Sequence, residues 1–195
     1  MRLLAFVDIH GDAKALNEIV RKSQNVDILV CAGDLSDWGA NLDKFISVLE
    51  KAKKPLLIIH GNHEIEEDLQ KVALKFENVK IIHEKILEID KFTFFGYGGG
   101  GFSLVDREFE SAWKAKKESL INKKVILVTH APPYKTALDK LNSHYAGCKS
   151  IRTFIELMQP VLHICGHLHE NAGTSDTIGK TKIINPGFGR IIEIK

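Results

Sequence analysis

The sequence predicts an α/β fold in one domain. Apolar runs of strand length alternate along the chain with segments whose apolar residues recur at helical spacing. The strand-like runs are continuously apolar, which is typical of a sheet that is buried on both faces. No linker, low-complexity segment or internal repeat divides the 195 residues, a length that suits a single domain. We therefore expect one domain over residues 1–195.

The first part of the chain is predicted to follow a βαβαβα order. Strand-like runs lie at residues 3–7, 27–32 and 56–59. Between the first two runs, Leu16, Ile19 and Val20 have the spacing of one helical face. The two later helices carry apolar faces at Leu42, Phe45, Ile46 and Leu49, and at Ile65, Leu69, Val72, Ala73 and Phe76.

After residue 78 the predicted strands become shorter. Residues 79–83, 85–90 and 92–96 indicate a meander, which the run Gly98–Gly101 interrupts as a flexible connection. Further helices are expected around Phe109, Trp113 and Leu120 and from Ile151 to Met158, before Pro160. Buried strands are expected at 125–129 and 161–165, and short antiparallel strands at 171–176, 181–185 and 190–194.

The composition is that of an ordinary globular protein, with 44% hydrophobic and 27% charged residues. A net charge of +2 without a Lys/Arg block gives no strong sign of a nucleic-acid partner. No apolar run approaches the roughly 20 residues of a membrane span. Three cysteines without a Cys-x-x-Cys pair, and the lack of a secretory signal, favour reduced thiols and a cytoplasmic location. Homo-oligomerisation stays open.

Side chains of the kinds that bind metals lie in five short islands, each at the end of a strand-like run. In open α/β sheets, the groups at the carboxyl ends of strands converge on one crevice, where ligands bind. In two islands the candidates are two residues apart, which places both side chains on the same side of an extended strand. The islands are Asp8-Ile9-His10, Gly33-Asp34, Gly61-Asn62-His63-Glu64, His130 and Gly166-His167-Leu168-His169.

Seven of these side chains are candidate metal ligands. Seven are too many for one tetrahedral ion and suit two ions that share a carboxylate. The set combines imidazole, carboxylate and amide groups without a thiolate, so it favours Mn, Fe, Zn, Co or Ni over Ca²⁺ or Mg²⁺. We therefore expect two divalent transition-metal ions as cofactors. The candidates are Asp8, His10, Asp34, Asn62, His130, His167 and His169.

The order and spacing of the five islands resemble those of the calcineurin-like metallophosphoesterases, over nearly the whole chain. The resemblance implies a β-sandwich of mixed sheets flanked by helices, in αββα layers. It also implies hydrolysis of a phosphate ester by in-line attack of a hydroxide that bridges two metal ions. One ion would be bound by Asp8, His10, Asp34 and His169, and the other by Asp34, Asn62, His130 and His167, with Asp34 as the bridge.

The same resemblance makes His63, next to the ligand Asn62, the general acid for the leaving oxygen. Asp37 is the candidate carboxylate that orients His63, because the sequence from Gly33 to Asp37 matches the Gly-Asp-x-x-Asp motif of the Ser/Thr protein phosphatases. Such a carboxylate fixes the tautomer and supports the imidazolium form. Alternatively, Asp37 caps the helix before Leu42 or is a solvated loop acid.

Two departures from the motifs of the protein phosphatases indicate which branch of the family this chain resembles. Val7 precedes Asp8 where the protein phosphatases have Gly, and Trp38 stands where they carry a phosphate-binding Arg. The chain is also shorter than those phosphatases and than the repair nucleases, so the small bacterial and archaeal phosphoesterases are more similar. We expect a phosphodiesterase acting on a small phosphodiester such as a cyclic nucleotide. The alternatives are a phosphomonoesterase acting on a small metabolite and a non-catalytic scaffold.

Substrate specificity is expected in the segment 131–148, whose aromatic and histidine side chains could face the pocket. The N-terminus of the following helix could offer free N–H groups to a phosphate, and the stretch resembles a Gly-Ser-x-x-x-Arg pattern with Cys in place of Ser. The alternative is a covering loop and an ordinary helix start. The candidate substrate residues are Tyr134, His144, Gly147, Cys148 and Arg152, whereas His60, His83 and His163 are expected to be structural.

Overall fold

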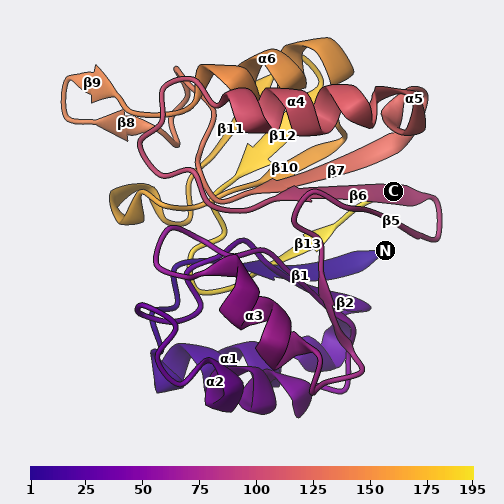
Figure 1. Cartoon of the computed structure of the whole chain (residues 1–195), viewed down its shortest axis with the longest axis vertical. Helices are drawn as coiled ribbons and strands as arrows, with labels where there is room; N and C mark the ends of the chain where they lie inside the picture. The colour runs from indigo at the N-terminus through magenta and orange to yellow at the C-terminus, as the bar shows by residue number, and fades with distance from the viewer.

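The computed structural model describes residues 1–195 as two sheets packed face to face, with helices on both outer sides (Figure 1). This β-sandwich of mixed sheets flanked by helices confirms the expected fold class. One outer side carries α1 (Ala13–Lys22), α2 (Leu42–Glu50) and α3 (Glu66–Ala73), and the other carries α4 (Arg107–Ala115), the short α5 (Lys117–Leu120) and α6 (Lys149–Met158).

The first sheet has five strands in the order β13-β1-β2-β3-β4. Strands β1 to β4 are parallel, and β13 pairs antiparallel with β1. This pairing brings the two ends of the chain together, and the ammonium group of Met1 donates to the carbonyl of Ile194 at 3.0 Å. The strands are β1 (Arg2–Phe6), β2 (Ile28–Cys31), β3 (Leu56–Ile58), β4 (Val79–Ile81) and β13 (Arg190–Glu193).

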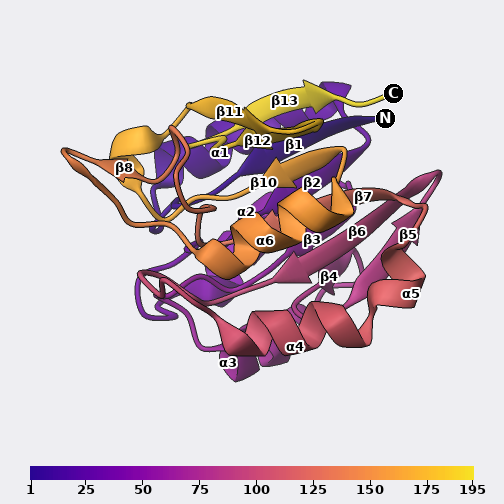
Figure 2. The same cartoon turned by 90° about the horizontal axis from the view of Figure 1, so that it is seen from above.

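The second sheet has six strands in the order β11-β12-β10-β7-β6-β5. Its four central strands are parallel, and antiparallel strands close both edges. Seen from above, α4 and α6 cover the outer face of this sheet (Figure 2). The strands are β5 (Ile86–Ile89), β6 (Phe92–Tyr97), β7 (Lys124–Thr129), β10 (Leu162–Ile164), β11 (Ser175–Ile178) and β12 (Thr181–Ile184).

Three apolar clusters fill the spaces between the four layers, which explains why the strand-like runs are continuously apolar. In β1, Leu3 and Ala5 point between the sheets, whereas Leu4 and Phe6 point toward α1 and α2. Successive side chains of a strand alternate between its faces, so a strand covered on both faces needs apolar residues at every position. The outer face of the six-stranded sheet holds the third cluster, under α4 and α6.

One prediction about strand pairing is wrong. The run at 79–83 was expected in a meander, but β4 pairs in parallel with β3 in the five-stranded sheet, because α3 connects the two strands as a crossover. Only β5 and β6 form the antiparallel hairpin. The C-terminal strands have the expected antiparallel pairings, since β11 pairs with β12 and β13 pairs with β1 in the other sheet. Strand β12 also pairs in parallel with β10.

A small hairpin that the sequence analysis did not predict projects from the six-stranded side, at the left of Figure 1. It consists of β8 (Lys140–Leu141) and β9 (His144–Tyr145). The buried carboxylate of Asp139 holds its base, because it accepts the N–H groups of Lys135 and Gly147, both at 2.9 Å. No helix of the chain has the length and apolar character needed to cross a membrane.

Candidate metal centre

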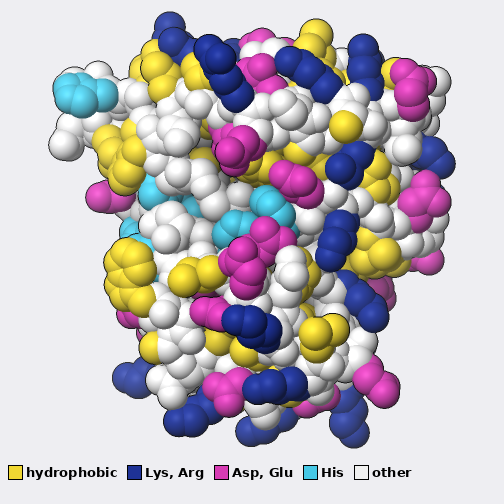
Figure 3. Space-filling view, in the orientation of Figure 1, with side chains coloured by type: hydrophobic (Ala, Val, Ile, Leu, Met, Phe, Trp, Pro, Cys, Tyr) yellow, Lys and Arg dark blue, Asp and Glu magenta, His cyan; other side chains and the backbone are white.

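The five islands converge at one edge of the sandwich, toward the left of Figure 1. They lie in the loops that follow the carboxyl ends of β1, β2, β3, β7 and β10. Figure 3 shows histidine side chains at mid-height between the two layers, next to acidic and hydrophobic side chains. The convergence of polar groups at strand ends is the arrangement that the sequence predicts.

The backbone of these loops differs from the extended form that the spacing suggested. Strand β1 ends at Phe6, and Asp8 and His10 lie beyond it with φ of 55° and 47°. Asp34 and His167 are also left-handed, with φ of 50° and 72°. Non-glycine residues seldom adopt this conformation, and it concentrates at functional sites. Asp8 and His10 therefore approach the same centre through a strained turn and not through strand alternation.

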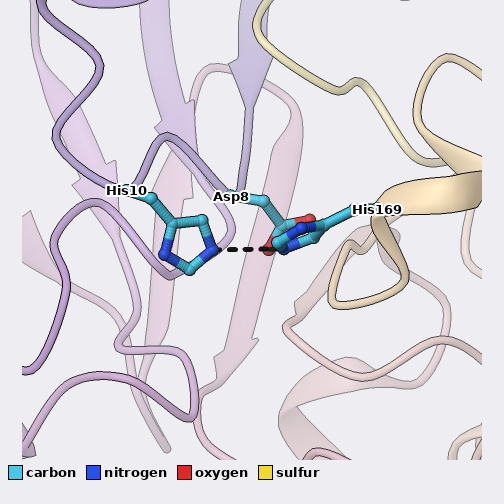
Figure 4. A group of neighbouring side chains, drawn as sticks. All are labelled: Asp8, His10 and His169. Atoms are coloured by element: carbon cyan, nitrogen blue, oxygen red, sulfur yellow. Dashed lines mark hydrogen bonds and ion pairs between the residues drawn. The ribbon is translucent and has the colours of Figure 1, made fainter.

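One group of ligand-type side chains joins the first and last islands. His10 Nε2 lies 3.1 Å from His169 Nε2, and His169 Nε2 lies 4.0 Å from Asp8 Oδ1 (Figure 4). His10 Nε2 also lies 3.7 Å from Asp34 Oδ2. Two imidazole nitrogens and two carboxylates thus face a shared point, which is a suitable donor set for a divalent transition metal.

A second group lies on the other side of Asp34. His130 Nε2 is 3.3 Å from Asp34 Oδ2 and 2.8 Å from Asn62 Oδ1, and His167 Nδ1 is 2.8 Å from the same amide oxygen. The Nδ1–H of His130 donates to the carbonyl of Ala32 at 3.0 Å, so the lone pair of the neutral ring points at these two oxygens. Three electron-rich atoms that face one another require a cation or proton between them, so the group fits a metal ion.

The pKa shifts of Asp34 and His130 indicate that the space between them favours a positive charge. Burial opposes ionisation of Asp34, but its hydrogen bond to His130 and the charge of that ring lower the pKa of Asp34 overall. Burial likewise disfavours a charged His130, yet Asp34 and Asp8 raise its pKa. Burial and the neighbouring His130 lower the pKa of His167 to about 4, so its ring is neutral near pH 7 and can donate a lone pair.

Two glycines allow Asp34 to lie between the two groups of ligand-type side chains. A Cβ on Gly61 would lie 2.0 Å from Asp34 Oδ1, and a Cβ on Gly33 would lie 2.7 Å from the backbone of Gly61 and 2.8 Å from His130 Nδ1. Both contacts are far shorter than van der Waals separations. The loops after β2 and β3 can approach this closely only because neither residue has a side chain.

Asp37 lies between His10 and His63 and is closer to His10, whereas the sequence motif predicts a contact with His63. Its Oδ1 is 2.6 Å from His10 Nδ1 and 3.7 Å from His63 Nδ1. A carboxylate on Nδ1 of His10 leaves Nε2 free to bind a metal. The helix-cap alternative is wrong, because the residue that precedes α2 is Asn41.

His63 lies at the edge of the centre with its backbone N–H bonded to Asp34 Oδ1 at 2.9 Å. Its ring is 4.9 Å from that of His10, between centroids, and 4.7 Å from the indole of Trp38. Nδ1 of His63 has no hydrogen-bond partner. The ring lies in the wall of the pocket, which is the position that a proton donor requires, and Asp37 does not hydrogen-bond to it.

Two further residues shape the centre and were not assigned a role from sequence. The buried carboxylate of Glu64 accepts the N–H of Ser36 at 3.0 Å and that of Gly61 at 3.1 Å, so it connects the loops after β2 and β3. Asn171 donates its amide to the carbonyls of Leu138 and Lys140, which connects the turn of His169 to the β8–β9 hairpin. Each lies within two residues of a candidate ligand, a proximity that could have identified it.

The expected phosphate-binding helix start is not available. The N–H of Gly147 already donates to Asp139 Oδ2 at 2.9 Å, and that of Cys148 donates to the carbonyl of Pro132 at 2.8 Å. The guanidinium of Arg152 is bonded to Glu156 and to the carbonyls of Tyr134 and Lys135. These contacts correct the expectation of free N–H groups and support the alternative of a covering loop.

Tyr134 and His144 also lie outside the pocket at the metal centre. Tyr134 contacts Tyr145 at 6.1 Å between ring centroids, and His144 is exposed on β9. The pocket has a volume of about 280 Å³, and the only residue of the segment 131–148 in its wall is Leu141. Its wall consists of Asp34, Asn62, His63, Phe102, Leu141, His167, Leu168, His169 and Glu170.

The remaining histidines have structural contacts. His163 is fully buried, bonds to Thr129 Oγ1 at 2.8 Å, and has its pKa lowered to about 3 by burial. His60, Glu66 and His83 form a second cluster, with ligand atoms within 4.8 Å of one another. However, His83 Nδ1 accepts the N–H of Gly98 at 2.8 Å, so its Nε2 carries the proton that faces Glu66 at 3.5 Å. This cluster therefore lacks a free nitrogen on His83.

Comparison with known proteins agrees with this geometry. The family profile described as calcineurin-like phosphoesterase matches residues 1–171. An uncharacterized protein of Methanocaldococcus jannaschii is 31% identical over 203 residues, with 95% of this chain and 88% of that protein covered. A probable cyclic nucleotide phosphodiesterase of Fibrobacter succinogenes is 26% identical over 172 residues, covering 84% of this chain and 65% of that protein.

Solved structures share the fold. A crystal structure of a protein from Thermus thermophilus superposes with a TM-score of 0.80 at 18% identity, over 95% of this chain and 88% of that one. A structure described as a novel archaeal phosphodiesterase has a TM-score of 0.53 at 18% identity, over 96% of this chain and 84% of that one. A dimetal phosphatase from Danio rerio has a TM-score of 0.64 at 12% identity, covering 94% of this chain and 86% of that one.

Proposed function

We propose that this chain, which belongs to the calcineurin-like phosphoesterase family, hydrolyses a small phosphodiester with the help of two divalent transition-metal ions. Family membership supports a metal-dependent phosphoric ester hydrolase. The number of ions, the preference for a diester and the role of each side chain are our inference. The observation that carries it is the position of Asp34, whose Oδ2 faces ligand-type nitrogens on both sides.

The two groups around Asp34 would each hold one ion. Mn, Fe, Ni, Co and Zn all suit these mixed imidazole, carboxylate and amide donors. Two ions at such a centre supply a water of lowered pKa and neutralise charge on the phosphoryl oxygens. Asp34 would contact both ions. Asp8, His10 and His169 would complete one set of ligands, and Asn62, His130 and His167 the other.

The surrounding residues would orient these ligands and move a proton. Asp37, 2.6 Å from His10 Nδ1, would hold that ring with Nε2 toward the centre. Glu64 would fix the two loops that carry Asp34 and Asn62. His63 would protonate the leaving oxygen, because its ring lies in the wall of the pocket.

Charge in the pocket favours a diester over a monoester. None of the nine wall residues is Lys or Arg, and Glu170 adds an acidic group. A diester carries one negative charge and a monoester up to two, so the monoester needs more positive charge around it. The similarity to a probable cyclic nucleotide phosphodiesterase supports the same choice.

The test compares kcat/KM for bis-p-nitrophenyl phosphate and p-nitrophenyl phosphate with Mn²⁺, Co²⁺, Ni²⁺ and Zn²⁺ in turn. We expect the diester to be preferred with at least one metal, and Asp34→Asn to abolish the activity. Asp43→Asn, in the first turn of α2, is the matched control and should retain it. A strong preference for the monoester would contradict the diester proposal, and no hydrolysis of either ester with any metal would favour a scaffold.

A further inference from the structure

Two aromatic side chains are exposed beside the metal centre. The residue exposure is 79% for Trp38 and 66% for Phe102, whereas Trp113 and Phe95 are 4% and 0% exposed. An aromatic side chain in water forgoes the burial that usually stabilises it. Exposed apolar groups that border a polar site are typical of ligand-binding surfaces.

Trp38 is held against the proposed proton donor. Its indole packs on the ring of His63, with 4.7 Å between centroids and 36° between planes. The backbone of Trp38 is left-handed, with φ of 52°, which is strained for a large side chain. Trp38 directly follows Asp37, so the loop that carries Asp34 and Asp37 also places the indole at the edge of the centre.

Phe102 occupies a corresponding place beside the second group of ligands. It follows the glycine run, and Gly101 lies beside the centre, with its Cβ position 3.6 Å from His167 Cε1. The ring of Phe102 meets the ring of His167 edge-on, at 4.5 Å between centroids. Together with Leu141 and Leu168, Phe102 gives the pocket of about 280 Å³ an apolar part of its wall.

We propose that Trp38 and Phe102 form an aromatic subsite that binds planar aromatic or heteroaromatic substituents of the phosphate ester. The inference rests on the proposed function, because that function places the phosphorus atom of the ester at Asp34. Substituents of a diester bound there extend away from the centre, past the rings of His63 and His167. Trp38 and Phe102 are exposed and lie directly against those two rings. Stacking on them would select planar groups without requiring specific hydrogen bonds.

The first test detects binding by a signal other than product formation. Trp113→Phe leaves Trp38 as the single tryptophan, since the chain has two, and its emission is followed in the zinc-loaded protein. Diphenyl phosphate and dimethyl phosphate have the same charge and differ in the presence of rings. We expect diphenyl phosphate to quench or shift the emission at concentrations where dimethyl phosphate does not. Equal responses to both, or none to either, would overturn the subsite.

The second test measures specificity. For the double variant Trp38→Ala/Phe102→Ala, we expect the ratio of kcat/KM for bis-p-nitrophenyl phosphate to that for methyl p-nitrophenyl phosphate to fall about 5- to 10-fold. Trp38→Phe should keep the wild-type ratio, as should Leu74→Ala, an exposed apolar control on the far end of α3. An equal loss on both substrates would assign the two rings a packing role only.

The two proposals fail in different ways. If the wild-type protein hydrolyses neither diester but Trp38 emission still responds to diphenyl phosphate alone, the proposed phosphodiesterase function is wrong and the aromatic subsite stands. If both diesters are hydrolysed while the emission and the specificity ratio do not change, the function stands and the subsite is wrong.

Discussion

The substitution Gly61→Ala tests whether the closeness of the loops after β2 and β3 is what places Asp34. Gly61 does not have a positive φ, so alanine can adopt its backbone conformation. The new Cβ would lie 2.0 Å from Asp34 Oδ1 and 2.6 Å from its Cγ, against 3.4 Å or more for an ordinary contact. The carboxylate or the loop must therefore move by about 1.4 Å.

A shift of this size is large for a metal ligand. Ligand distances in metal sites are met within about 0.2 Å, and a misplacement of about 1 Å can cost about 100-fold in rate. Because Asp34 would serve both ions, we expect Gly61→Ala to lose metal from both groups and to lower kcat/KM at least about 100-fold. The protein should remain folded, since the clash is at the edge of the sandwich.

Metal content per chain after gel filtration, measured together with kcat/KM and a thermal melt, decides the outcome. The control is Gly173→Ala, which meets no atom within 4 Å but has φ of +81°. This control should lose about 1 kcal/mol of stability, a few degrees in Tm, and keep its metal and activity. Full metal content and unchanged kcat/KM in Gly61→Ala would refute the reasoning.

Two other predictions concern histidines. His63→Ala should lower kcat about 100-fold or more for diesters whose alcohol is a poor leaving group, while metal content stays at the wild-type value. A parallel loss of metal would show that His63 is a ligand instead. His163 has a folded-state pKa near 3 against 6.5 for the free side chain, so the unfolded chain takes up this proton first. Its contribution to the free energy of unfolding is therefore constant above about pH 6.5 and falls as the pH drops toward 3, by up to about 1.4 kcal/mol per unit. His163→Gln keeps a donor for Thr129 without titrating, so its denaturation midpoint should depend less on pH over this range; the same pH dependence as wild type would contradict the assignment.

The layered fold and the convergence of the islands could be predicted because both follow from local patterns. Continuous apolar runs such as Leu3–Val7 indicate strands covered on both faces, and the structure places alternate residues of β1 in two different cores. Polar residues that directly follow such runs must lie at a strand end. The five islands therefore indicated the position of the centre without any knowledge of strand order.

Contacts between distant segments could not be read from local pattern. The apolar pattern of residues 79–81 suits a strand of either sheet. Only the crossover through α3 decides that β4 pairs with β3. The N–H groups of Gly147 and Cys148 appeared free because Asp139 and Pro132, their acceptors, precede them in an irregular segment. Asp37 was assigned to His63 by motif, whereas the loop geometry places its carboxylate nearer His10.

The central claim is that Asp34 lies between two metal ions, and anomalous diffraction from crystals soaked in Mn²⁺ tests it most directly. We predict two peaks about 3.5–4 Å apart, one within the group of Asp8, His10 and His169 and the other within the group of Asn62, His130 and His167. Both peaks should contact Asp34. A single peak, or a peak at the cluster of His60, Glu66 and His83, would contradict the account.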